Sequence, residues 1–180
     1  MIMTNPRGFT IFFAVLVSSL ALAIGLAIYD LLIRELALSQ TATQSQYAIY
    51  AADTGAECAL YWDFNAPVLN GSPSVFATSS APGNAPPPSA GVNCAGQDIT
   101  DSPVVGIPWT TEIPPRTPTS ATTVFWVSLG VAQKDPCAEV TVEKVSVNGD
   151  PPTTKIVSRG LNTCTSGALI QLERAIEVNY

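Results

Sequence analysis

The chain has 180 residues, with 14 acidic and 8 basic side chains, no histidine and four cysteines. The net charge of −6 argues against nonspecific binding to nucleic acid, because an acidic surface repels phosphate. The lack of histidine excludes Ser-His-Asp and Cys-His catalysis and histidine-ligated zinc sites. Charged residues make up only 12% of the chain, about half of the share usual in soluble proteins, whereas apolar residues make up 47%.

The first predicted element is an uncharged run of 21 residues, residues 9–29, with the sequence FTIFFAVLVSSLALAIGLAIY. As a helix this run measures about 31 Å, which matches the hydrocarbon core of a bilayer. A secretory signal peptide is one reading, although its apolar core usually has only about 7–15 residues. The other two readings are an ordinary membrane anchor and an anchor that also drives assembly. Arg7, before the run, favours an N-terminus in the cytoplasm.

The helix is predicted to continue beyond the membrane, through residues 30–62. This stretch contains no proline and a single glycine, Gly55, and the first helix breaker after it is Pro67. We therefore expect one helix over residues 9–62, whose lower end covers the C-terminal domain. The residues expected to form its packing stripe recur at helical spacing: Leu32, Leu36, Tyr47, Tyr50, Ala51, Cys58, Tyr61 and Trp62.

The rest of the chain changes in composition near residue 121. Residues 63–121 are predicted to form a variable loop region, with a flexible linker as the alternative, because residues 65–121 hold 11 of the 15 prolines. Residues 122–180 contain four runs that are β-branched, aromatic or alternating, separated by turn signals: residues 122–130, 137–147, 154–159 and 168–178. The last run is also compatible with a helix, since it contains Leu, Glu and Arg. The predicted fold class is α+β, with a long N-terminal helix packed on a C-terminal four-stranded antiparallel sheet.

The four cysteines all follow the predicted membrane segment. No C-x-x-C pair occurs, which argues against a zinc ribbon or a thioredoxin-type site. Four cysteines allow three pairings, and the sequence does not choose among them. We expect Cys58–Cys94, which would pin the loop region to the helix, and Cys137–Cys164, which would join strands; free buried thiols are the alternative.

The N-terminal residues resemble a known processing signal. Pro6-Arg7-Gly8-Phe9-Thr10, followed by the long uncharged run, resembles the class III signal of type IV pilins and pseudopilins. Residues 50–62 are similar to minor pilin-like proteins with a PilX-type N-terminus. The resemblance implies a pilin-like fold and a leader peptide of residues 1–8. It also implies cleavage between Gly8 and Phe9 by a prepilin peptidase, methylation of Phe9, and assembly through the helix that begins with Phe9, Thr10 and Phe13.

One position departs from the family pattern. Most pilins carry a glutamate four residues after the methylated phenylalanine, where it neutralises the N-terminal amine of a neighbouring subunit. The corresponding residue here is Phe13, which cannot make that pair. This favours a minor subunit, at or near the filament tip, over a subunit of the main shaft.

Motifs for catalysis or metal binding are missing from the sequence. It lacks G-x-S-x-G, the P-loop, S-x-x-K and the EF-hand loop. Asp98 and Asp101 lie close together, but two carboxylates are too few for the 6–8 oxygen ligands of calcium. We therefore expect no enzyme activity, no cofactor and no metal site.

The sequence thus predicts a structural minor subunit of a type IV pilus or a related pseudopilus. Its expected location is the cytoplasmic membrane, with the N-terminus inside, followed by the extracellular pilus. The expected partners are other pilin subunits, the prepilin peptidase, the membrane and the pilus assembly machinery, with no direct contact to nucleic acid. Two alternatives stay open: a single-pass membrane-anchored surface binding domain, and a pseudopilin of a type II secretion or DNA-uptake system.

Overall fold

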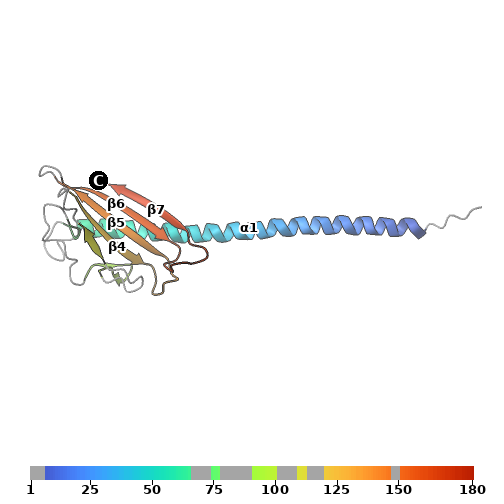
Figure 1. Cartoon of the computed structure of the whole chain (residues 1–180), viewed down its shortest axis with the longest axis horizontal. Helices are drawn as coiled ribbons and strands as arrows, with labels where there is room; N and C mark the ends of the chain where they lie inside the picture. Colours follow the sequence, from blue (N-terminus) through green and yellow to red (C-terminus); the bar gives the residue numbers. More distant parts are fainter. Residues whose placement is uncertain (1–6, 66–73, 78–90, 101–108, 113–119, 147–150) are drawn as a thin grey trace, which may run out of the picture. The chain divides into compact units, whose positions relative to one another are not determined.

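A computed structural model describes residues 7–65, 74–77, 91–100, 109–112, 120–146 and 151–180 (Figure 1). The chain divides into two compact units, Met1–Thr43 and Gln44–Tyr180. Helix α1, Arg7–Phe64, is longer than the predicted helix by two residues at each end. The strands that follow are β1 (Asn93–Cys94), β2 (Gln97–Asp98), β3 (Thr110–Glu112), β4 (Ser120–Ser128), β5 (Cys137–Val145), β6 (Thr153–Leu161) and β7 (Glu173–Asn179). The coarse prediction of a long helix followed by an antiparallel sheet is confirmed.

In the polar middle of α1, hydroxyl side chains form hydrogen bonds with backbone carbonyls of the preceding turn. The Thr41 and Thr43 hydroxyls donate to the carbonyls of Ala37 and Ser39, at 2.9 and 3.0 Å. Such bonds satisfy polar side chains within the helix and leave its backbone ladder intact. The helix ends at Phe64, where the backbone N–H of Asn65 still donates to the carbonyl of Tyr61 at 2.9 Å.

The main sheet has five strands rather than the predicted four, in the order β3-β4-β5-β6-β7, and every neighbouring pair is antiparallel. The additional strand, β3, comes from the segment predicted to be loop and pairs Thr110 with Val124 of β4. With three residues it is too short to show an alternating pattern in the sequence. The first three predicted runs correspond to β4, β5 and β6.

The last predicted run is a strand rather than a helix, but only from Glu173 onward. Strand β7 pairs with β6 along its full length: Asn179 lies opposite Lys155 at one end, and Glu173 lies opposite Leu161 at the other. Its half-buried residues are Ile176 and Val178, which alternate with exposed ones as on a half-covered strand. Tertiary pairing therefore overrides the helix propensity of this run.

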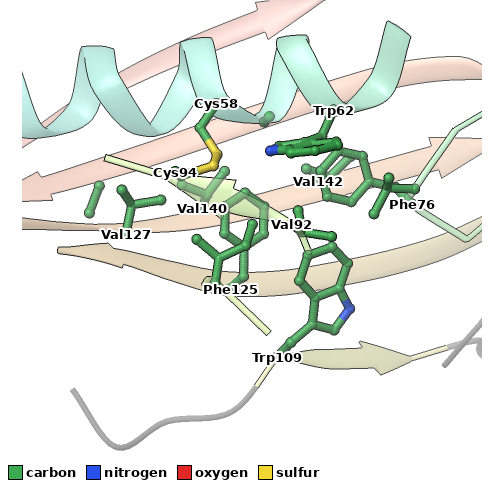
Figure 2. Packing of buried hydrophobic residues seen from close by; sticks show 14 of the residues in the cluster. Cys58, Trp62, Phe76, Val92, Cys94, Trp109, Phe125, Val127, Val140 and Val142 are labelled. Atoms are coloured by element: carbon green, nitrogen blue, oxygen red, sulfur yellow. A yellow bond between two sulfur atoms is a disulfide. The ribbon is translucent and has the colours of Figure 1, made fainter. Parts of the chain in front are cut away.

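The hydrophobic core lies between the last five turns of α1 and the sheet, within the unit Gln44–Tyr180 (Figure 2). Phe76, Trp109 and Phe125 stack on one another with ring centroids 5.3–5.7 Å apart. Val92 and Ile99, on either side of the β1–β2 hairpin, are also fully buried. Segments of the Pro-rich region that the structure describes thus contribute aromatic and aliphatic side chains to the core.

The helix face that meets the sheet is built from small residues, and the predicted stripe is wrong in part. Ala51, Cys58 and Trp62 are buried as predicted. Tyr47, Tyr50 and Tyr61 are instead 48%, 62% and 57% exposed, and Leu32 and Leu36 are also exposed. The places next to the sheet are taken by alanines that are at most 4% exposed: Ala48, Ala51, Ala52, Ala56 and Ala59.

Close approach of the two backbones explains this choice of residues. A side chain at Gly160 of β6 would collide with the backbone of Ala48 and Ala52. On the helix, a side chain at Gly55 would collide with the side chains of Ser158 and Val140. Glycine is therefore required on both surfaces, and bulky aromatic side chains of the helix are excluded from this contact.

Candidate functional site

The candidate functional site is the apolar segment, which we define as residues 9–29 of α1. Every residue of this segment is exposed, including Phe9 at 73% and Phe13 at 58%. The hydroxyls of Ser18 and Ser19 donate hydrogen bonds to backbone carbonyls of the preceding helical turn, at 2.8–3.0 Å. Their polar groups are thereby satisfied without water, as residence in a bilayer requires.

Length and composition make α1 a candidate membrane span. Among the residues that the structure describes, α1 is the one helix that is both long enough and apolar enough to cross a bilayer. The apolar part of this helix contains no buried residue. A core helix of a soluble domain would be buried instead. The apolar segment is therefore a surface that another hydrophobic phase can cover, either lipid or other helices.

The residues implied in processing lie at the start of the helix. Arg7 and Gly8 form its first two positions, followed by Phe9 and Thr10. Residues 1–6, the rest of the expected leader peptide, lie outside the described residues. Phe13 brings an apolar ring to the position where the family pattern has a carboxylate, so this part of the helix carries no acidic side chain.

Two disulfides connect the folded unit, and they have the expected pairing. Cys58 of α1 joins Cys94 of β1, with Cα atoms 5.9 Å apart. Cys137 of β5 joins Cys164 in the β6–β7 connection, with Cα atoms 5.7 Å apart. All four cysteines of the chain are thus paired in disulfides.

The first disulfide belongs to a set of contacts that hold the β1–β2 hairpin on the helix. The indole N–H of Trp62 donates to the carbonyl of Asn93 at 3.1 Å. Asp98 closes the hairpin region by accepting hydrogen bonds from Gly91 and from both the backbone and the hydroxyl of Thr100. Burial raises the pKa of Asp98, but these hydrogen bonds outweigh it and hold the pKa below its usual value. Asp98 therefore has a structural role in a turn, and Asp101 lies outside the described residues.

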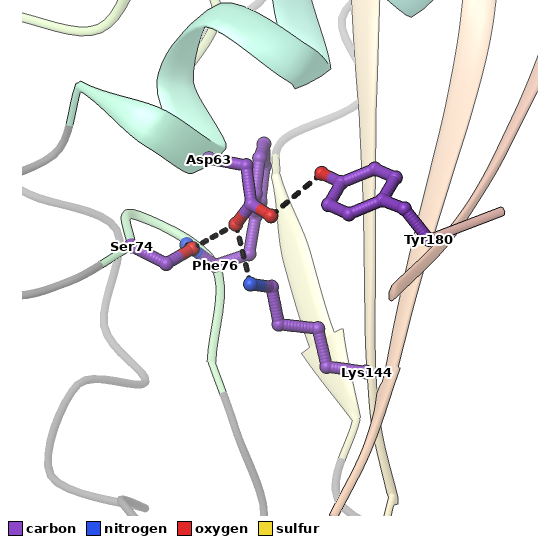
Figure 3. Close-up of polar contacts among 5 residues, drawn as sticks. All are labelled: Asp63, Ser74, Phe76, Lys144 and Tyr180. Atoms are coloured by element: carbon purple, nitrogen blue, oxygen red, sulfur yellow. Dashed lines mark hydrogen bonds and ion pairs between the residues drawn. The ribbon is translucent and has the colours of Figure 1, made fainter. Parts of the chain in front are cut away.

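A buried polar cluster at the end of α1 was not predicted from the sequence (Figure 3). Asp63 forms an ion pair with Lys144 of β5 and accepts hydrogen bonds from the hydroxyls of Ser74 and Tyr180, the latter at 2.7 Å. The side chains of Asp63 and Lys144 are only 4% and 6% exposed. Burial and the neighbouring Asp63 carboxylate raise the pKa of Tyr180, because both disfavour a phenolate.

This Asp63 cluster (Asp63, Ser74, Lys144 and Tyr180) connects separate parts of the folded unit. Each member is engaged by another, and the cluster ties the end of α1 to β5 and to the residue that follows β7. The signal that could have revealed it is a lysine inside the otherwise alternating run of β5, where Lys144 occupies a buried position of the strand. Its partner is 81 residues away in sequence, so the sequence does not identify it.

No group of three or more His, Cys, Asp or Glu residues that could hold a metal ion occurs among the described residues. Comparisons with protein-family models, with curated proteins and with solved structures found no match to this chain.

Proposed function

We propose that this chain is a minor structural subunit of a type IV pilus or a related pseudopilus. In this proposal a prepilin peptidase cuts after Gly8, and the subunit waits in the cytoplasmic membrane with its N-terminus inside. It then enters a filament through the apolar segment, which exchanges lipid for the helices of neighbouring subunits. The partners are therefore other pilin subunits, the peptidase and the assembly machinery.

The proposal rests on one observation: the apolar segment lies at the start of a helix that continues far beyond it. Helix α1 begins next to the Gly8–Phe9 bond and continues to Phe64. A simple anchor needs only the length of the bilayer, about 20 residues. Lipid tails are as apolar as leucine, so the segment gains no hydrophobic free energy by leaving lipid for other helices. Close helix packing and an external motor must supply that free energy.

Phe13 favours a minor position in the filament. An amine or carboxylate is costly in lipid and is retained where it serves docking. Without a carboxylate at position 13, the subunit cannot neutralise the N-terminal amine of a neighbour in the filament core. A subunit at or near the tip has fewer such neighbours and needs the pair least.

The alternative is a single-pass anchor that displays the folded unit at the cell surface and is never cut or polymerised. The same apolar segment supports it, because its length alone is sufficient to span a bilayer. A pseudopilin of a type II secretion or DNA-uptake system shares the architecture and the processing step, so it differs from a pilus subunit only in the machinery that assembles it.

The test is the chemistry of the mature N-terminus in the native host. Intact-mass measurement and N-terminal sequencing should find a chain that begins at methylated Phe9, and Gly8→Leu should leave the leader attached. Gly25→Leu is the matched control, since a side chain there meets nothing within 4 Å, and it should be cut normally. A wild-type chain that retains residues 1–8 and is absent from sheared surface fibres would contradict the proposal and support the anchor.

A further inference from the structure

The last strand of the main sheet has one edge that no other strand of the described chain covers. Strand β7 stands at the end of the order β3-β4-β5-β6-β7, so it pairs with β6 on one side only (Figure 1). It has seven residues, whereas β3 at the opposite edge of the sheet has three. A long edge strand presents a row of backbone donors and acceptors that can pair with another chain.

The register of β6 and β7 shows which backbone groups face this open edge. Tyr180 and Thr154 exchange both of their backbone hydrogen bonds, at 3.0 and 2.8 Å. Such pairs alternate along antiparallel strands, so the even-numbered residues of β7 bond to β6 and the odd-numbered residues point their N–H and C=O groups away from it. Among the described residues, no hydrogen bond reaches the backbone groups of Ala175, Glu177 and Asn179.

Strand β7 lacks most of the features that protect an edge strand from pairing. Its sequence contains no proline, and its register with β6 contains no bulge. One charged side chain, Arg174, lies on the helix side of the strand, at its start, where it donates a hydrogen bond to the Ser45 hydroxyl at 3.0 Å. The stretch from Ala175 to Asn179 is therefore open to an added strand.

Helix α1 offers an apolar surface next to this edge. Strand β7 adjoins the helix at Ser45, beside the start of the strand, and at Phe64, whose ring stacks on the residue that follows the strand. Ile49 follows Ser45 by four residues and Leu60 precedes Phe64 by four, so both lie on the flank of the helix that β7 adjoins. Ile49 is 47% exposed and Leu60 is half-buried, which leaves room for further apolar contacts on this flank.

The strand itself extends this apolar surface. Ile176 and Val178 point to the helix side of β7, and both are only half-buried. A strand added at the open edge would place every second side chain over these apolar groups. Its other side chains would lie on the outer face of the sheet, beside Glu173 and Glu177, which are about half exposed. Opposite charges on neighbouring strands stabilise such a pairing.

We propose that the open edge of β7 binds an extended segment of another protein, which joins the sheet as an antiparallel sixth strand. The segment alternates apolar side chains, which cover Ile49 and Leu60, with lysine or arginine, which lie beside Glu173 and Glu177. An extended backbone satisfies donors and acceptors that alternate along a strand, whereas lipid tails offer neither. A second copy of β7 fits less well, because it brings its own glutamates to the same face.

This proposal concerns the folded unit Gln44–Tyr180 and holds for a pilus subunit and for a membrane anchor alike. Hydrogen exchange of the full chain in detergent, resolved by residue with NMR, tests whether the edge is open. The amides of Ala175, Glu177 and Asn179 should exchange at least about tenfold faster than those of Ile176 and Val178, which bond to β6. Equal protection of the two sets would show that another part of this chain or a second copy already covers the edge, and would overturn the proposal.

Binding is tested with a synthetic peptide of alternating valine and lysine, as long as β7 and with blocked ends. It should slow the exchange of the outward amides of β7. In an antiparallel pair with valine over the helix, the lysine residues carry the backbone groups that bond to β7. A peptide with N-methylated lysine nitrogens should therefore fail, whereas one with N-methylated valine nitrogens should bind. Equal binding of the two methylated peptides, which have the same charge, or no binding by the unmodified peptide, would overturn the proposal.

A proline in β7 removes one outward donor from the protein itself. The N–H of Ala175 points away from β6, so Ala175→Pro leaves the bonds between β6 and β7 intact. It should weaken peptide binding at least about tenfold, because the facing carbonyl of the peptide loses its donor. Ala175→Ser is the matched control, since it retains the N–H and should bind like the wild type. An Ala175→Pro chain that keeps the tryptophan unfolding transition and binds the peptide like the wild type would contradict the proposal.

A change on the helix gives a second readout that leaves β7 untouched. Ile49→Gln should weaken peptide binding about fivefold, because it removes apolar surface that the added strand covers. Tyr61→Gln should have no effect, since Tyr61 is similarly exposed, at 57%, but lies beside the β1–β2 hairpin. Equal binding by the two variants would mean that the peptide does not lie between β7 and this flank of the helix, and the proposal would fail.

Discussion

Helix α1 contains two stretches that differ in which side of the helix the large side chains occupy. Between residues 9 and 43 every residue is exposed, and Leu20 and Leu22, two residues apart and therefore on nearly opposite sides, are both more than half exposed. Between residues 44 and 64 the large side chains Tyr50 and Tyr61 point outward, while alanines meet the sheet. Residues 9–29 of the first stretch are apolar on all sides, as lipid requires, whereas in the second stretch small residues occupy the side that meets the sheet. Where Gly160 approaches Ala48 and Ala52, residue size rather than hydrophobicity decides which side chains of the helix face the sheet, whereas the large Trp62 is buried further along the helix.

We expect the largest effect on stability from a side chain placed in the contact between α1 and the sheet. Gly160→Val would put its Cβ on the backbone of Ala48 and Ala52, which cannot move without separating α1 from β6. We expect the unit Gln44–Tyr180 not to fold, a loss beyond the usual 1–3 kcal/mol for overpacking. Tryptophan fluorescence of the full chain in detergent measures this unit alone, because Trp62, Trp109 and Trp126 all lie in it.

The matched control for this change lies in the other stretch. A side chain at Gly25 meets nothing within 4 Å, so Gly25→Val should leave the unfolding transition of the tryptophans unchanged. A Gly160→Val protein that unfolds like the wild type would show that the helix is not held against β6 as closely as the structure places it.

The second prediction compares an ion pair in the middle of α1 with one at its end. Asp30–Arg34 is exposed, whereas Asp63–Lys144 is almost completely buried. Lys144→Met should lower the free energy of unfolding by about 3 kcal/mol, because it leaves the Asp63 carboxylate buried without its cation. Urea unfolding followed by tryptophan fluorescence measures the loss.

Another lysine of the same sheet provides the control. Lys155 pairs with Glu177 at 3.1 Å, but both side chains are about half exposed, at 45% and 50%. Lys155→Met should therefore cost no more than about 0.5 kcal/mol. Equal losses for Lys144→Met and Lys155→Met would mean that the Asp63 cluster contributes no more than a surface contact.

The sequence predicts the parts of this fold that depend on local pattern. The uncharged residues 9–29 and the lack of proline through residue 62 define the helix, and alternation in residues 137–147 defines β5. Turn residues separate the strands, and the meander follows from their short connections. These features need no knowledge of distant partners.

The features that the sequence does not predict all depend on distant contacts. Strand β3 exists because β4 pairs with it, and the outward position of Tyr50 follows from the close approach of Gly160, which no helical periodicity encodes. Asp63 and Lys144 each look like ordinary charged residues until the fold places them together. The leader cleavage at Gly8 and the roles of Phe9, Thr10 and Phe13 remain predictions, which processing experiments test.

The smallest predicted effect concerns Tyr180, which joins β7 to the end of the helix. Its folded-state pKa is raised above the value of about 10 for an unfolded chain. Its contribution to stability is therefore fully present below pH 10. Above pH 10 the unfolded chain loses the phenolic proton while the folded chain retains it, so the contribution declines.

Tyr180→Phe should remove this contribution and keep the ring stacked on Phe64, whose centroid is 5.3 Å away. Near pH 7 the loss should be about 1 kcal/mol, the value of one hydrogen bond at a half-exposed site. Urea unfolding between pH 8 and pH 11 should then show the two proteins converging as the pH rises past 10. A constant difference across this range would mean that the Tyr180 hydroxyl titrates equally in both states, and the link from β7 to Asp63 would be too weak to hold the end of α1.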